Sequence, residues 1–207
     1  MKIRAAIVTG LVLATCVSVV AEAATAKVCK IVKDGTGDAE GIVPGPDDAL
    51  DIVSGDVATN TKTVTGVIRL KKYAETDTNA PMGRVYYMHW VAPGTPDILY
   101  VSASVDPVTG VTYDYGYLGS LGIGTYEKLG DATGKIDVAK NEIRIHAPIS
   151  GFKGHGAKMA PKASLKSLRA TSTYLIGVLG SGLVSDADEA TDKTYVMSTP
   201  SCVTVGK

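Results

Sequence analysis

Hydrophobic and polar residues alternate along much of this chain, and the alternation predicts strands rather than helices. From Leu50 onward apolar residues recur mostly with a period of two, and turn residues follow at intervals of about ten. Each alternating segment is bounded by Pro, Gly, Asn or Asp, as strands of antiparallel sheets tend to be. These segments are residues 63–73, 84–92, 97–105, 110–119 and 141–149.

Segment 63–73 has one apolar and one polar side. Val64 and Ile68 lie on one side of the expected strand, whereas Thr65 and Arg69 lie on the other. We therefore expect one face of its sheet to be buried and the other to be exposed to water.

The connections between these segments complete the predicted fold. Residues 106–110 and 137–141 have the composition of tight turns, and residues 150–164, rich in Gly and Lys, predict a mobile surface connection. Residues 163–179 have a leucine spacing that also suits a helix, but their β-branched residues favour a strand. About eight or nine strands in one chain predict an all-β fold, an antiparallel β-sandwich of Ig-like or jelly-roll-like type.

The N-terminal residues have the composition of a secretory signal peptide. Lys2 and Arg4 precede an apolar stretch at residues 5–21, and two A-x-A patterns follow it. The apolar stretch is short for a membrane span. We therefore expect residues 1–26 to be removed on export and residues 27–207 to form a single secreted domain.

The same residues also allow a lipoprotein signal. Residues 13–16 (LATC) would be its box, and Cys16 would carry the lipid that tethers the chain to a membrane. Thr15 is bulkier than the small residue such a site prefers, and the residues after Cys16 are apolar where a tether would be polar. Secretion is the better interpretation.

Charge excludes two classes of partner. The 207 residues include 21 basic and 21 acidic side chains, and removal of Lys2, Arg4 and Glu22 leaves 19 and 20. Broad electrostatic binding of nucleic acid or of an anionic membrane needs a basic surplus on one face. A nearly neutral chain argues against both.

Two cysteines remain after export, Cys29 near the new N-terminus and Cys202 near the end of the chain. An even pair in an exported protein predicts a disulfide that joins the two ends. In the chain-entropy model, a loop of this length restricts the unfolded chain by roughly 5 kcal/mol. A metal site or a reactive thiol is the alternative, but no neighbouring His or second Cys supports it.

Carboxylates are concentrated in residues 34–56, which contain no Lys or Arg. Oxygen-rich loops with several glycines are what a calcium ion needs, so this segment predicts structural calcium, with a solvated acidic loop as the alternative. A second acidic loop is expected at residues 186–192. The carboxylates of the first segment are Asp34, Asp38, Glu40, Asp47, Asp48, Asp51 and Asp56.

Aromatic residues form the other candidate site. In segment 84–92 the rings of Tyr86 and Trp90 are expected in the core. In segment 110–119, Tyr113, Tyr115 and Tyr117 alternate with smaller or polar residues and form a row on one face. An exposed row of rings could stack on sugar rings, whereas burial with the hydroxyl groups at the rim explains the row equally well.

No catalytic signature is present. The three histidines, His89, His146 and His155, are scattered, and none has a second potential ligand at metal-binding spacing. The chain contains no G-x-S-x-G motif. We therefore expect a protein that is not an enzyme.

Four stretches of the chain carry a resemblance to a known class of domain. They are CKIVKDGTGDAEG (29–41), ALDIVSGDVATNTKTVTGVIRLKKY (49–73), APMGRVYYMHW (80–90) and PSCVTVGK (200–207). In these stretches the chain resembles exported bacterial β-sandwich domains of the DOMON and family 9 carbohydrate-binding-module type.

The resemblance implies a non-catalytic sandwich, often with a structural calcium near the N-terminal Asp-Gly segment. On that pattern Asp34 and Asp38 would be the first calcium ligands, with Asp51 near them. Together with the tyrosine row at Tyr113, Tyr115 and Tyr117, it predicts a domain that binds an extracellular glycan or cell-wall polymer. The alternative is a structural or protein-interaction component of the cell envelope with no small-molecule ligand.

Overall fold

The computed structural model describes residues 27, 29–42, 44–119, 125–176 and 183–206. The expected signal peptide and the alternative lipid attachment at Cys16 lie outside the described residues.

The described residues form eleven strands, one short α-helix and one 3-10 helix. They are β1 (Val32–Lys33), β2 (Ile52–Thr59), β3 (Thr63–Leu70), β4 (Arg84–Val91), β5 (Ile98–Asp106), β6 (Gly110–Leu118), β7 (Tyr126–Asp131), β8 (Thr133–Asp137), η1 (Val138–Lys140), β9 (Glu142–Pro148), α1 (Ile149–Gly154), β10 (Ser164–Ile176) and β11 (Leu183–Val196).

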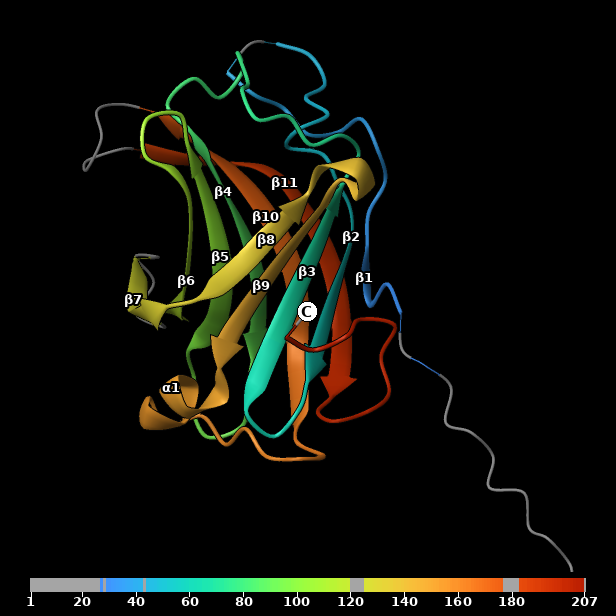
Figure 1. The fold of residues 1–207 in the computed structure, drawn as a ribbon, viewed down its shortest axis with the longest axis vertical. Coiled ribbons are helices and arrows are strands. Elements are labelled where there is room, and N and C mark those ends of the chain that lie inside the picture. The colour runs from blue at the N-terminus through green and yellow to red at the C-terminus, as the bar shows by residue number, and fades with distance from the viewer. Residues whose placement is uncertain (1–26, 28, 43, 120–124, 177–182, 207) are drawn as a thin grey trace, which may run out of the picture.

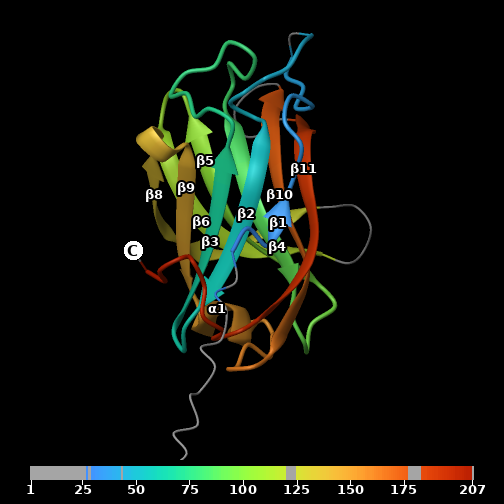
Figure 2. The same ribbon diagram turned by 90° about the vertical axis from the view of Figure 1, so that its right-hand side faces the viewer.

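The strands make two antiparallel sheets that pack face to face as a β-sandwich (Figure 1). One sheet has the order β1-β2-β3-β9-β8, and the other has the order β11-β10-β4-β5-β6-β7. The chain passes from one sheet to the other between β7 and β8, where only Ala132 separates the strands. At the opposite side β1 and β11 lie side by side (Figures 1 and 2). The prediction of a two-sheet antiparallel fold is therefore confirmed.

All six segments predicted as strands are strands, including residues 163–179, which contain β10. The expected number of strands was too low, partly because the acidic segments were assigned to loops and partly because β1, β7 and β8 were not identified. Residues 34–56 contain most of β2, and residues 186–192 lie within β11. Carboxylates can occupy a strand when paired cations or backbone N–H groups compensate their charge, and a sequence pattern does not reveal such pairing.

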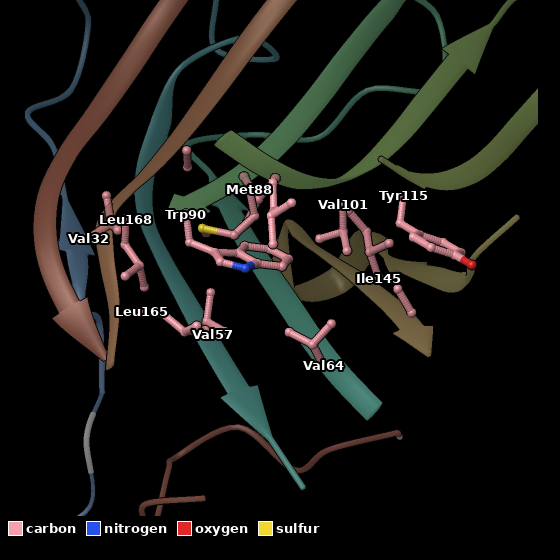
Figure 3. Packing of buried hydrophobic residues seen from close by; sticks show 14 of the residues in the cluster. Val32, Val57, Val64, Met88, Trp90, Val101, Tyr115, Ile145, Leu165 and Leu168 are labelled. Carbon is pink, nitrogen blue, oxygen red and sulfur yellow. The ribbon is translucent and has the colours of Figure 1, made fainter. Parts of the chain in front are cut away.

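The core lies between the two sheets and is built by alternate residues of the central strands (Figure 3). Tyr86, Met88 and Trp90 of β4 point into it and are fully buried. Facing them are apolar side chains of the other sheet such as Val57 and Val64. The expected burial of Tyr86 and Trp90 is confirmed.

The outer face of the five-stranded sheet is covered around Thr65 and Val67, where the sequence predicted exposure to water. The C-terminal segment after β11 crosses this face (Figure 1), and Val203 packs on Ala58 and Val67. The backbone N–H of Gly206 donates to the hydroxyl of Thr65, which is fully buried. The prediction failed because a chain end far away in the sequence provides the cover.

The connection at residues 150–164, expected to be a mobile surface segment, is partly buried. It begins with helix α1, and Phe152 on that helix is fully buried against Trp90 and Tyr115. Met159 is also buried. The many Gly and Lys residues of this segment suggested a surface loop, although a few of its apolar side chains are buried.

A disulfide joins Cys29 and Cys202, as the sequence predicted, with the two Cα atoms 5.2 Å apart. The bonded residues are separated by 173 positions in the sequence. The bridge therefore ties the start of the described domain to the segment that covers the five-stranded sheet.

Candidate functional site

A concave surface lies at one end of the sandwich. It consists of two adjoining hollows of about 420 and 400 Å³, which share Glu75, Thr76, Val105 and Pro107 as lining residues. The β3–β4 connection, the β5–β6 turn and η1 form this end, which is the upper end in Figure 1. We call the two hollows together the end cleft.

Arg84 and Tyr73 form one wall of the end cleft. The Arg84 guanidinium is 5.5 Å from the centre of the Tyr73 ring, pairs with Asp77 at 3.1 Å, and also donates to the carbonyl of Ala74. The side chain of Arg84 is almost fully buried, yet its Nε has no hydrogen-bond partner among the described residues. These contacts shape the β3–β4 connection and leave a free donor beside the first hollow.

The β5–β6 turn forms the opposite wall. The carboxylate of Asp106 accepts the backbone N–H groups of Val108 and Thr109, both at 2.7 Å. These hydrogen bonds lower the pKa of Asp106, so the side chain remains ionised in weakly acidic solution. Gly110, with φ of 85°, closes the turn in a conformation that favours glycine. The predicted turn at residues 106–110 is confirmed.

The tyrosine row does not form a single surface. Tyr113 is half-buried and lines the second hollow of the end cleft, whereas Tyr115 is buried in the core. Tyr117 lies toward the other end of β6, where its ring stacks on His155 at 3.9 Å. The three rings face inward along the length of the sandwich, and only Tyr113 contributes to the end cleft.

Glycines make room for two of these rings. A Cβ added at Gly134 would lie 2.4 Å from the Tyr113 ring, and one added at Gly151 would lie 2.3 Å from the Tyr115 hydroxyl. Both glycines therefore mark places where an aromatic ring packs directly on the backbone.

The proposed calcium ligands come together only in part. Asp34 accepts the backbone N–H of Gly35, and the carboxylate of Asp38 lies on the other side of this glycine. Asp51 accepts the N–H of Gly37, which brings it to the same loop. One carboxylate oxygen each of Asp34 and Asp51 is buried and has no hydrogen-bond partner among the described residues.

Two observations count against a complete calcium cage at this loop. The ammonium group of Lys71 lies 2.7 Å from Asp48 and 3.7 Å from Asp51, so positive charge is already present. Among the described residues, no group of three or more His, Cys, Asp or Glu side chains is arranged to hold a metal ion. The side chains described here therefore do not by themselves fit a calcium site.

The acidic segment is also less exposed than the sequence indicated. Asp47, Asp51 and Asp56 are buried, and Asp56 pairs with Arg69 at 2.7 Å. Burial raises the pKa of Asp47, the backbone N–H of Ala49 opposes this shift, and the nearby carboxylate of Asp77 adds to it. The alternative of a solvated acidic loop is therefore wrong for these three carboxylates.

A second aromatic cluster covers the outer face of β4. Tyr87 stacks on Tyr126 at 4.2 Å, and the Nε2 atom of His89 lies 3.2 Å from the Tyr126 hydroxyl. His89 is fully buried, and this burial, together with the charge of Arg169, lowers its pKa to about 3. The imidazole is therefore neutral near pH 7 and has a structural role.

The sequence interpretation missed most residues of the end cleft. Arg84, Glu75 and Tyr73 were not singled out, because none of them belongs to a motif. One usable signal was the interruption of strand alternation at residues 74–83, since such loops at the end of a sandwich commonly carry binding residues.

Two comparisons with known proteins found no match. No family model matches the chain, and no curated protein is detectably similar to it. Within the described residues, no helix has the length and apolar character needed to cross a membrane.

Proposed function

We propose that this protein is a secreted, non-catalytic β-sandwich domain that binds an extracellular glycan or cell-wall polymer in the end cleft. The observation that carries the proposal is the end cleft itself, in which the half-buried ring of Tyr113 is combined with the carboxylates of Glu75 and Asp106. Aromatic rings stack on the apolar faces of sugars, and carboxylates accept hydrogen bonds from their hydroxyl groups. The resemblance to DOMON and family 9 carbohydrate-binding modules supports the same class of ligand.

The direct test is a pull-down of the exported chain on insoluble cellulose, chitin and peptidoglycan. Replacing all three tyrosines of the row would remove Tyr115 from the core, so a blocking substitution is sharper. Thr76 is exposed and lines both hollows, and Thr76→Trp should abolish retention while the fold is kept. Thr112→Trp, at an exposed position of β6 outside the cleft, is the matched control and should still bind.

Two outcomes would contradict the proposal. A wild-type chain that is retained on none of the polymers has no glycan-binding activity of this kind. A Thr76→Trp variant that is retained as well as Thr112→Trp would place any binding elsewhere on the molecule.

A protein partner in the cell envelope is the second candidate. Val108, Val111 and Val138 lie on or beside the rim of the end cleft and are 79%, 40% and 52% exposed. Exposed apolar residues around a cleft also suit a protein interface. Crosslinking in the native secretome would favour this function if one protein is captured through the cleft while glycans are not.

A further inference from the structure

The charges of the end cleft are unevenly distributed. Of the residues that line the two hollows, Glu75, Asp77 and Asp106 carry carboxylates, and Arg84 is the one that carries a cationic group. Arg84 is already paired with Asp77 at 3.1 Å. The remaining carboxylates of Glu75 and Asp106 therefore give the cleft a negative potential that repels acidic ligands.

Glu75 is the carboxylate best placed to contact a ligand. It is exposed and lines both hollows, so a molecule that spans the cleft passes beside it. Asp106 already accepts two backbone N–H groups, which leaves its second oxygen for other contacts. A ligand with a cationic group would gain a charge-assisted hydrogen bond from Glu75.

Arg84 favours a hydrogen-bond acceptor on the same ligand. Its side chain is only 2% exposed, it lines the first hollow, and its Nε–H has no acceptor among the described residues. A buried donor of this kind needs an oxygen acceptor. An anionic oxygen would lie close to Asp77 and Glu75, so a neutral hydroxyl oxygen suits the position better.

We propose that the end cleft selects amino-sugar polymers, whose ring hydroxyls meet Arg84 and whose ammonium groups meet Glu75. The inference rests on the proposed glycan-binding function and names the class of glycan. Tyr113 contacts the apolar faces of the sugar rings, which are similar in most glycans, and the charges discriminate between polymers.

The test compares four soluble β-1,4- or α-1,4-linked hexamers by isothermal titration calorimetry, at a pH below the pKa of the sugar amine. The hexamers of glucose, N-acetylglucosamine and glucosamine differ in the substituent at C2, and a galacturonic acid hexamer supplies negative charge. The glucosamine hexamer should bind at least about threefold more tightly than the glucose hexamer. Added salt should reduce this difference in affinity, because it screens the charge of Glu75.

Glu75→Gln is the decisive variant, because it removes the charge and keeps the shape of the side chain. It should lower affinity for the glucosamine hexamer about threefold more than it lowers affinity for the glucose hexamer. Glu127→Gln changes an equally exposed position on β7, outside the cleft, and should leave both affinities as they are.

The outcomes separate this inference from the function on which it rests. Equal affinity for the glucose and glucosamine hexamers, or tightest binding of the galacturonic acid hexamer, overturns the amino-sugar preference but leaves glycan binding intact. Binding of none of the four hexamers, joined with no retention on insoluble polymers, overturns both.

Discussion

At the scale of single residues, strand β4 shows how alternation distributes side chains between two environments. In the stretch VYYMHWV, Tyr86, Met88 and Trp90 enter the core, whereas Tyr87 and His89 join the aromatic cluster on the outer face. Both faces of β4 are therefore buried, and a titratable imidazole lies where no water reaches it.

The buried imidazole of His89 makes the fold sensitive to acid. The unfolded chain binds a proton at this residue below about pH 6.5, whereas the folded chain binds it only near pH 3. The stability that neutral His89 provides above pH 6.5 is thus lost as the pH falls toward 3, by about 1.4 kcal/mol per pH unit. Between pH 7 and pH 5, urea unfolding should show a loss from this residue of about 2 kcal/mol that His89→Gln does not show.

His146 is the matched control for this measurement. Burial and the charge of Arg144 lower its pKa as well, but the side chain is only half-buried. His146→Gln should therefore change the pH dependence less than His89→Gln. An equal acid response in the wild type and in His89→Gln would contradict the assigned role of His89.

A second prediction concerns the glycine beneath Tyr115. A methyl group at Gly151 would lie 2.3–2.6 Å from atoms of the Tyr115 ring, so Gly151→Ala should lower the free energy of unfolding by about 1–3 kcal/mol. Gly154→Ala, on the same helix with no atom within 4 Å of the added Cβ, should not destabilise the protein. Thermal unfolding of the two variants gives the comparison, and equal melting temperatures would contradict it.

At the scale of elements, Arg69 connects three strands of the five-stranded sheet. From β3 its guanidinium contacts Asp56 on β2 at 2.7 Å and Glu142 on β9 at 2.9 Å. Asp56 also accepts the backbone N–H of Ile31, which brings the start of β1 into the same network. The burial of Asp56 and Glu142 is tolerated because this network compensates their charge.

Removing the Arg69 guanidinium should therefore lower the free energy of unfolding more than breaking a surface ion pair does. Arg69→Met leaves the buried carboxylate of Asp56 without its cation, whereas Glu142 keeps Arg144 at 2.6 Å. The substitution should lower the free energy of unfolding by about 3–5 kcal/mol. In the double variant with Asp56→Asn, part of that loss should be recovered, because one of the two charges is gone. A double-mutant cycle in urea measures the coupling, and additive losses would show that the pair is not coupled.

A further prediction concerns calcium binding at the loop that contains Asp34 and Asp38. Because Lys71 already lies beside Asp48 and Asp51, we expect a chelator to leave the melting temperature unchanged. A bound ion would instead raise the melting temperature with calcium concentration. A calcium-dependent rise that Asp51→Asn abolishes would establish the site that the resemblance implies.

The elements that the sequence predicted well are those whose stability comes from burial of one or both faces. Segments such as 84–92 and 97–105 lie in the middle of a sheet, and their apolar residues follow its period. The missed strands β1, β2, β7 and β8 hold glycine or charged residues at positions that are tolerated through specific partners or edge exposure, and β11 was assigned to a loop because of its acidic residues. A single sequence does not name those partners.

The candidate site was harder to predict for a related reason. Its residues come from strand ends and from three connections, and they become neighbours only when both sheets are assembled. Tyr113 was identified because it lies in a row of alternating tyrosines, whereas Glu75 follows no period and Arg84 is a charged residue at the first position of β4.

At the scale of the whole molecule, the two chain ends cooperate in stabilising one sheet. The disulfide joins Cys29 to Cys202, and the residues after Cys202 place Val203 over Val67. Cys29→Ser with Cys202→Ser should lower the free energy of unfolding by roughly 5 kcal/mol if the tail stays in place, and by more if it detaches. Reversible urea unfolding of both forms measures the difference, and equal stability would contradict this role of the bridge.

The disulfide between Cys29 and Cys202 also determines how the molecule responds to a pulling force. When residues on either side of the two cysteines are pulled apart, tension runs through the sulfur–sulfur bond and never reaches the ladders of β2 to β11. The oxidised domain would behave as a nearly inextensible link between whatever is attached at its two ends, and only a reductant would allow it to lengthen.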